Sequence, residues 1–135
     1  MTLFALGFRP FYLLAGIYAA LAVPLHALRY AGVLPGTDPL WHAHEMLFGF
    51  TFAVIAGFLF TAVRNWTGRD TPTGAALATI AAVWIAARLV APWSLAAAAT
   101  LDLAFAASVA WGIGRPIVAS NNRRNLFMVA IVLAL

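Results

Sequence analysis

Long apolar runs separated by short polar segments cover most of this chain. Four runs occupy approximately residues 11–33, 40–63, 74–90 and 95–114, and a fifth begins at Leu126 and continues to Leu135. Since about 20 apolar residues in a helix span the hydrocarbon core of a bilayer, the first four are long enough to cross it and the fifth is not. The pattern predicts an all-α integral membrane bundle with four complete transmembrane helices and the start of a fifth.

The segments between the runs contain residues that begin and end helices. Asp38 followed by Pro39 supplies a side-chain acceptor and a proline for the first helical position, so a helix is predicted to begin there. Pro24 lies within the first run, where it is expected to kink the helix. We predict loops at residues 64–72 and 120–125, a turn at residues 91–94, and a helix end at Arg115-Pro116.

Charge is scarce and unevenly placed. Only 9% of the residues are charged and 64% are hydrophobic, whereas about a quarter of a soluble domain is charged. The formal net charge is +4, and the basic residues outside the runs are Arg9, Arg64, Arg69, Arg115, Arg123 and Arg124. They fall at the N-terminus and at alternate turns, which predicts a cytoplasmic N-terminus. They form no basic face, so the expected partner is the lipid bilayer and not nucleic acid.

The absence of cysteine limits the chemistry that is available. The chain contains no cysteine and therefore has no disulfide, no thiolate metal site, no cysteine nucleophile and no cysteine-ligated iron–sulfur cluster. Any metal ligands must come from His, Asp, Glu, Met or the backbone.

The most informative polar residues open the second run, at Trp41-His42-Ala43-His44-Glu45. On a helix His42 and His44 point about 200° apart, so they do not easily bind one metal together. His42 and Glu45 share a face that continues as Gly49, Ala53 and Gly57, a ladder of small residues that favours close helix packing. The side of His44 faces either lipid or another helix.

Two interpretations of these histidines stay open from the residues alone. Polar groups in a membrane are costly and often functional, and imidazole is a good ligand for heme iron and copper. The alternative is a pair of interfacial histidines bonded near the headgroups.

Four other residues that can carry a charge, on the first, third and fourth runs, also bear on the site. His26 and Arg29 share a face of the first helix and reach the same depth as the cluster, where Arg29 either pairs with Glu45, meets a heme propionate or extends to the interface. Arg88 and Asp102 flank the turn at residues 91–94 and are expected to form a buried ion pair.

Four motifs together resemble the NnrS family over essentially the whole chain. They are Gly7-Phe8-Arg9-Pro10-Phe11, the run from Trp41 to Phe50, the segment from Ala56-Gly57-Phe58-Leu59 to Asn65-Trp66-Thr67-Gly68-Arg69, and Asn122-Arg123-Arg124-Asn125. Arg64 stands where the family pattern has proline.

The resemblance implies a bacterial inner-membrane protein that contains heme and copper and acts in nitric oxide metabolism or nitrosative stress resistance. His42 and His44 match the H-x-H of the family and become its candidate cofactor and metal ligands. Glu45 would accept a hydrogen bond from the other ring nitrogen of one imidazole and so orient it toward the metal. Such proteins have about twelve spans, so residues 1–135 form one helical region that corresponds to the N-terminal third, and the remaining helices are expected partners. The resemblance assigns no reaction and no catalytic residue.

Two other functions remain open at this point. The chain could be part of a transporter or permease in which the face of His42 and Glu45 binds a substrate or a proton. It could also be a truncated helical piece without activity.

Overall fold

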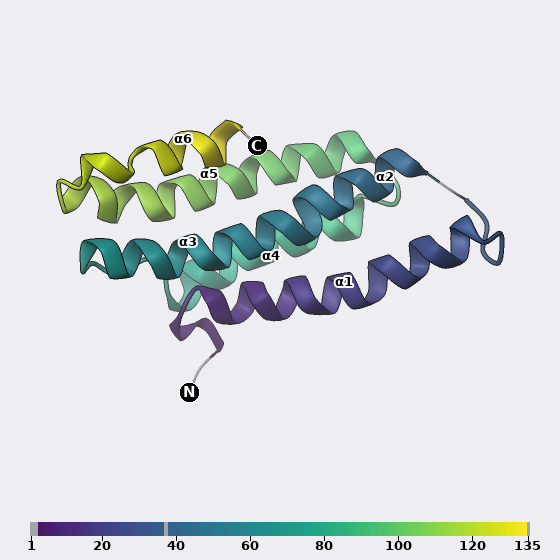
Figure 1. Cartoon of the computed structure of the whole chain (residues 1–135), viewed down its shortest axis with the longest axis horizontal. Coiled ribbons are helices and arrows are strands. Elements are labelled where there is room, and N and C mark those ends of the chain that lie inside the picture. The colour runs from purple at the N-terminus through teal and green to yellow at the C-terminus, as the bar shows by residue number, and fades with distance from the viewer. Residues whose placement is uncertain (1–2, 37, 135) are drawn as a thin grey trace.

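Helices lie side by side and form an antiparallel bundle in the computed structural model, which describes residues 3–36 and 38–134 (Figure 1). A short 3₁₀ turn, η1, precedes α1, and the element that follows α2 is a π-helix. The bounds are η1 Leu3–Ala5, α1 Phe8–Tyr30, α2 Pro39–His44, η2 Glu45–Thr51, α3 Phe52–Thr67, α4 Gly74–Val90, α5 Leu95–Ala119, the 3₁₀ turn η3 Arg123–Asn125, and α6 Phe127–Ala134.

Three of the predicted spans are confirmed by length and composition. The helices at Phe8–Tyr30, Pro39–Thr67 and Leu95–Ala119 are long and apolar enough to cross a membrane, whereas α4 has 17 residues and is shorter. The all-α class and the membrane character of the chain are therefore established. The start of a further helix is found in α6, close to the predicted position at Leu126.

α1 ends at Tyr30, before the predicted Val33, and two other predicted helix ends are wrong because the helix continues beyond them. α5 continues through Arg115 and Pro116 to Ala119, because proline removes a single backbone N–H and the helix on either side keeps its other bonds. α3 continues to Thr67 and ends at Gly68, whose φ of +64° gives the left-handed conformation that commonly closes a helix. The arginine at each of these two predicted ends lies on a helix that simply extends beyond the apolar run.

The predicted start at Asp38 is confirmed. The Asp38 carboxylate accepts a hydrogen bond of 2.9 Å from the Leu40 backbone N–H, and Pro39 occupies the first helical position. This cap fixes where the helix that carries both histidines begins.

The wide turn of η2 interrupts the α-helical register just after these histidines. Side chains supply donors to its carbonyl oxygens: the Thr51 hydroxyl donates to Met46 O at 2.9 Å, and the Trp84 indole N–H donates to Gly49 O at 3.1 Å. Such π segments occur frequently at functional sites.

Small residues let α1 approach η2 and α3 closely, as the sequence predicts. A Cβ atom added to Gly49 would lie 2.6 Å from Cε1 of Tyr18, and one added to Gly57 would lie 3.0 Å from Cε1 of Tyr12. Large side chains of α1 thus occupy the space that these two glycines leave.

Aromatic rings form the centre of the apolar core. Phe11, Phe60, Phe52 and Phe105 are almost fully buried, and the centroid distances are 5.8 Å for Phe11–Phe60, 5.6 Å for Phe11–Phe105 and 5.0 Å for Phe52–Phe105. These contacts pack α1, α3 and α5 against one another.

Candidate functional site

Five polar side chains from different elements meet inside the bundle and are called here the polar cluster. They are Tyr18 of α1, His44 of α2, Glu45 of η2, Arg88 of α4 and Asp102 of α5. Glu45, Arg88 and Asp102 have exposed fractions of 0%, 7% and 3%. Charges buried to this degree in an apolar bundle must be neutralised by partners.

Arg88 joins the two carboxylates of the cluster. Its Nη2 donates to Oδ1 and Oδ2 of Asp102 at 2.6 and 2.7 Å. Its Nε lies 3.1 Å from Oε2 of Glu45, an ion-pair distance without hydrogen-bond alignment, and its Nη1 has no partner. The predicted pair of Arg88 and Asp102 is confirmed, and it is part of a larger network.

His44 lies between the same two carboxylates. Its Nδ1 is 2.9 Å from Oε1 of Glu45, while its Nε2 is 3.3 Å from Oδ2 of Asp102 but is not aligned for a hydrogen bond. An Nδ1–H donated to Glu45 leaves the lone pair of Nε2 buried and directed into the cluster. A carboxylate that accepts from Nδ1–H, together with an Nε2 that makes no hydrogen bond, is the arrangement that orients metal-binding histidines.

The cluster has a surplus of negative charge. Two carboxylates, Glu45 and Asp102, face one guanidinium, Arg88, so the charges +1 and −2 give −1 when His44 is neutral. Tyr18 donates its hydroxyl to Oε2 of Glu45, which stabilises the carboxylate without changing the charge. A bound proton or a metal cation would restore neutrality.

His42 has different surroundings from His44. Its ring stacks on that of His26 from α1, with 3.6 Å between centroids and 11° between planes. The buried Nδ1 of His42 has no hydrogen-bond partner. The expectation that His26 could join this end of the bundle is confirmed, with His42 as its neighbour.

The comparison with protein families covers nearly the whole chain. The family model described as NnrS protein matches residues 2–135. The chain belongs to the NnrS family. Searches among curated proteins and among solved structures found no match.

One of the contacts predicted for Arg29 is wrong in this member of the NnrS family. Arg29 does not pair with Glu45, because Arg88 already occupies that carboxylate. Its guanidinium lies over the Trp41 ring, 5.2 Å from the centroid, and lines a cavity of about 310 Å³ at the same end of the bundle.

The two predicted histidines of the NnrS chain do not lie together, and each contacts different helices. His42 contacts α1, and His44 together with Glu45 contacts α4 and α5. His44 therefore faces packed helices and not lipid. The sequence did not identify Tyr18 as a member of the cluster. The available signal was Gly49, which has no side chain and so leaves room for a large residue of α1 such as Tyr18.

Proposed function

We propose that this chain forms the heme- and copper-binding region of an inner-membrane NnrS protein that acts on nitric oxide or protects against nitrosative stress. The observation that supports this most is that each predicted histidine has one buried ring nitrogen without a hydrogen-bond partner, Nδ1 of His42 and Nε2 of His44. Imidazole nitrogens are ligands for both copper and heme iron.

These residues fit a metal as part of a ligand set. Nε2 of His44 would hold it with Glu45 behind the ring, and Nδ1 of His42 would bind on the other side with His26 beside it. Among the described residues no group of three or more His, Asp or Glu is placed to hold a metal ion. Under this proposal the remaining ligands are supplied by the further helices of a longer NnrS protein.

When bound, heme iron or copper would supply an open coordination position for nitric oxide. The protein residues would hold the ligands and balance charge. A cation at His44 would offset the surplus negative charge of Glu45 and Asp102, and Arg29 would face a carboxylate of the heme. The arginines near the N-terminus and at alternate ends of the helices support a cytoplasmic N-terminus in this proposal.

The test compares visible spectra and metal content of the full-length protein with those of His42→Ala and His44→Ala. The expected result is a Soret band or copper content that is lost in one variant and restored by added imidazole. Similar elution and thermal unfolding of the variants would exclude misfolding as the cause. Unchanged heme and copper in both variants would rule out the ligand assignment.

The network of His44, Glu45, Arg88 and Asp102 favours one second candidate, a transport protein with a proton or substrate site. Buried carboxylates paired with arginine and histidine are a common feature of proton paths in membranes. This alternative predicts pH-coupled uptake or efflux by a colourless protein without iron or copper. The same metal analysis therefore distinguishes the two functions.

A further inference from the structure

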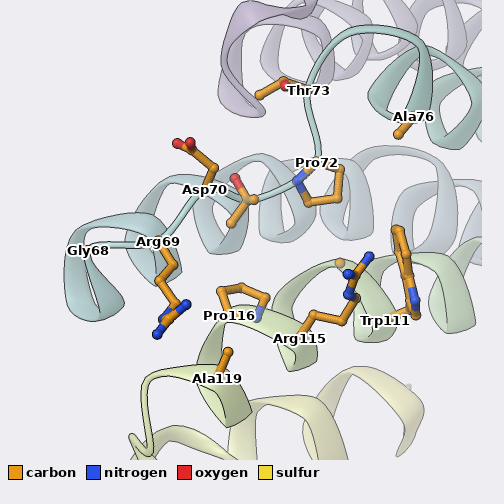
Figure 2. A pocket seen from close by; sticks show the side chains of 12 residues that line it. Gly68, Arg69, Asp70, Pro72, Thr73, Ala76, Trp111, Arg115, Pro116 and Ala119 are labelled. Carbon is orange, nitrogen blue, oxygen red and sulfur yellow. The ribbon is translucent and has the colours of Figure 1, made fainter.

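A second polar site lies at the opposite end of the bundle from the histidines. A cavity of about 600 Å³ opens between the loop after α3, the start of α4 and the second half of α5. Arg69 from the loop and Arg115 from α5 line it, and Figure 2 shows the two side chains on either side of Pro116.

The walls of this cavity are held by specific contacts. The buried Thr71 hydroxyl donates to Phe60 O at 2.9 Å, which fixes the loop on α3. A Cβ atom added to Gly112 would lie 2.9 Å from Cγ of Pro72, so the loop rests directly on α5. The cavity therefore belongs to the packed fold.

The two arginines of the cavity have no anionic partner among the described residues. The sequence has four acidic residues, of which Glu45 and Asp102 belong to the polar cluster and Asp38 caps α2. The fourth, Asp70, also lines the cavity but pairs with Arg64 at 3.0 Å, and Figure 2 shows its carboxylate turned away from Arg69. With Asp70 neutralised by Arg64, the two positive charges of Arg69 and Arg115 are left without a carboxylate, which suits an anionic ligand.

An apolar surface leads from the membrane side to this pair of charges. The residues Ala104, Ala107, Trp111 and Arg115 of α5 are all exposed and recur at helical spacing, so they form one stripe. Trp111 is 51% exposed, and the Arg115 guanidinium lies 5.1 Å from the centroid of its ring. A ligand that follows this stripe has an apolar tail and an anionic head.

We propose that this cavity binds the phosphate of an anionic phospholipid, with Arg69 and Arg115 holding the headgroup and an acyl chain along Trp111 and the alanines. Guanidinium groups suit phosphate oxygens because they donate two parallel hydrogen bonds. The site lies at the end where Arg64, Arg123 and Arg124 are also exposed, so the anionic lipids of a membrane surface are concentrated beside it.

The experiment measures quenching of tryptophan fluorescence in full-length protein reconstituted in phosphatidylcholine vesicles. Brominated phosphatidylglycerol is compared with brominated phosphatidylcholine. A basic residue near an anionic surface contributes about a fivefold preference, so wild type should favour phosphatidylglycerol at least about fivefold. The preference should fall in Arg69→Gln/Arg115→Gln and persist in Arg123→Gln/Arg124→Gln, which loses the same charge.

Each other outcome contradicts the proposal. A preference that survives in Arg69→Gln/Arg115→Gln, or that falls equally in Arg123→Gln/Arg124→Gln, would mean that the overall positive charge of this end attracts the lipid and that the cavity does not bind it. Selective quenching that persists in Trp111→Phe would place the lipid elsewhere. Removal of the preference by excess inorganic phosphate would identify the free anion as the ligand and overturn the assignment to a lipid.

Discussion

Replacing the charged members of the polar cluster one at a time should give an unequal set of stabilities. Arg88→Met leaves Glu45 and Asp102 without a cation, so the local charge changes from −1 to −2. Asp102→Asn instead changes it from −1 to 0, and the asparagine oxygen still accepts from Nη2 of Arg88. Because the cluster already has surplus negative charge, Arg88→Met should lower the free energy of unfolding much more than Asp102→Asn does.

The magnitudes follow from the contacts. Removing one partner of a buried ion pair costs about 3–5 kcal/mol, and Arg88 serves two carboxylates, so Arg88→Met should lie toward the upper end. Asp102→Asn gives up one charge-assisted hydrogen bond, about 1.5–3 kcal/mol. It also relieves the charge surplus, so we expect a net cost of at most about 2 kcal/mol.

The assay is unfolding of the purified protein in detergent micelles by added dodecyl sulfate, followed by circular dichroism. Arg64→Met is the matched control, because Arg64 pairs with Asp70 at 3.0 Å on the surface, where the side chains are 46% and 77% exposed. An exposed pair contributes about 0–1 kcal/mol. If Asp102→Asn cost as much as Arg88→Met, the charge surplus would be refuted.

Three further changes test the packing around the site. Gly49→Ala should lower the free energy of unfolding by about 1–3 kcal/mol, because its Cβ would meet Tyr18, whereas Gly16→Ala, with open space around it, should be harmless in the same assay. Trp84→Phe should cost about 1–3 kcal/mol by removing the indole N–H that donates to the carbonyl oxygens of Phe48 and Gly49, and an unchanged stability would contradict that role. His26→Ala should weaken copper binding roughly 10- to 100-fold, measured by titration with a competing chelator, because the His26 ring stacks on the His42 ring and holds it in place. His26→Phe keeps a stacked ring and should retain the affinity, and an equal loss in both variants would refute the orienting role.

Much of the helical layout could be predicted because lipid imposes a simple rule on sequence. The apolar runs gave α4 at its observed bounds and the start of α2 at Asp38, since length and caps are local properties. The end of α5 does not depend on local sequence alone. The helix continues past Pro116 because the residues after it pack against the bundle, and the Arg115-Pro116 pair contains no sign of that packing.

The network around His44 was only partly predictable, for a different physical reason. The pairing of Arg88 with Asp102 followed from two charges on adjacent spans. The connection to Glu45 and His44 depends on the wide turn of η2, and an α-helical wheel drawn through residues 42–57 contains no sign of that change. Helix arrangement also decides that Tyr18 meets Glu45, and periodicity does not determine it.

The π-helical turn has a consequence for how this segment can vary in evolution. A π-helix closes its hydrogen bonds over five residues and an α-helix over four, so η2 holds one residue more than an α-helix between the same flanks. In most membrane helices a single-residue deletion rotates one half against the other by about 100°. Here, a deletion within residues 46–50 can be absorbed by a return to α-helix, with His44 and Phe52 kept in place. Related chains that differ by one codon in this segment would therefore conserve the fold on both sides of it.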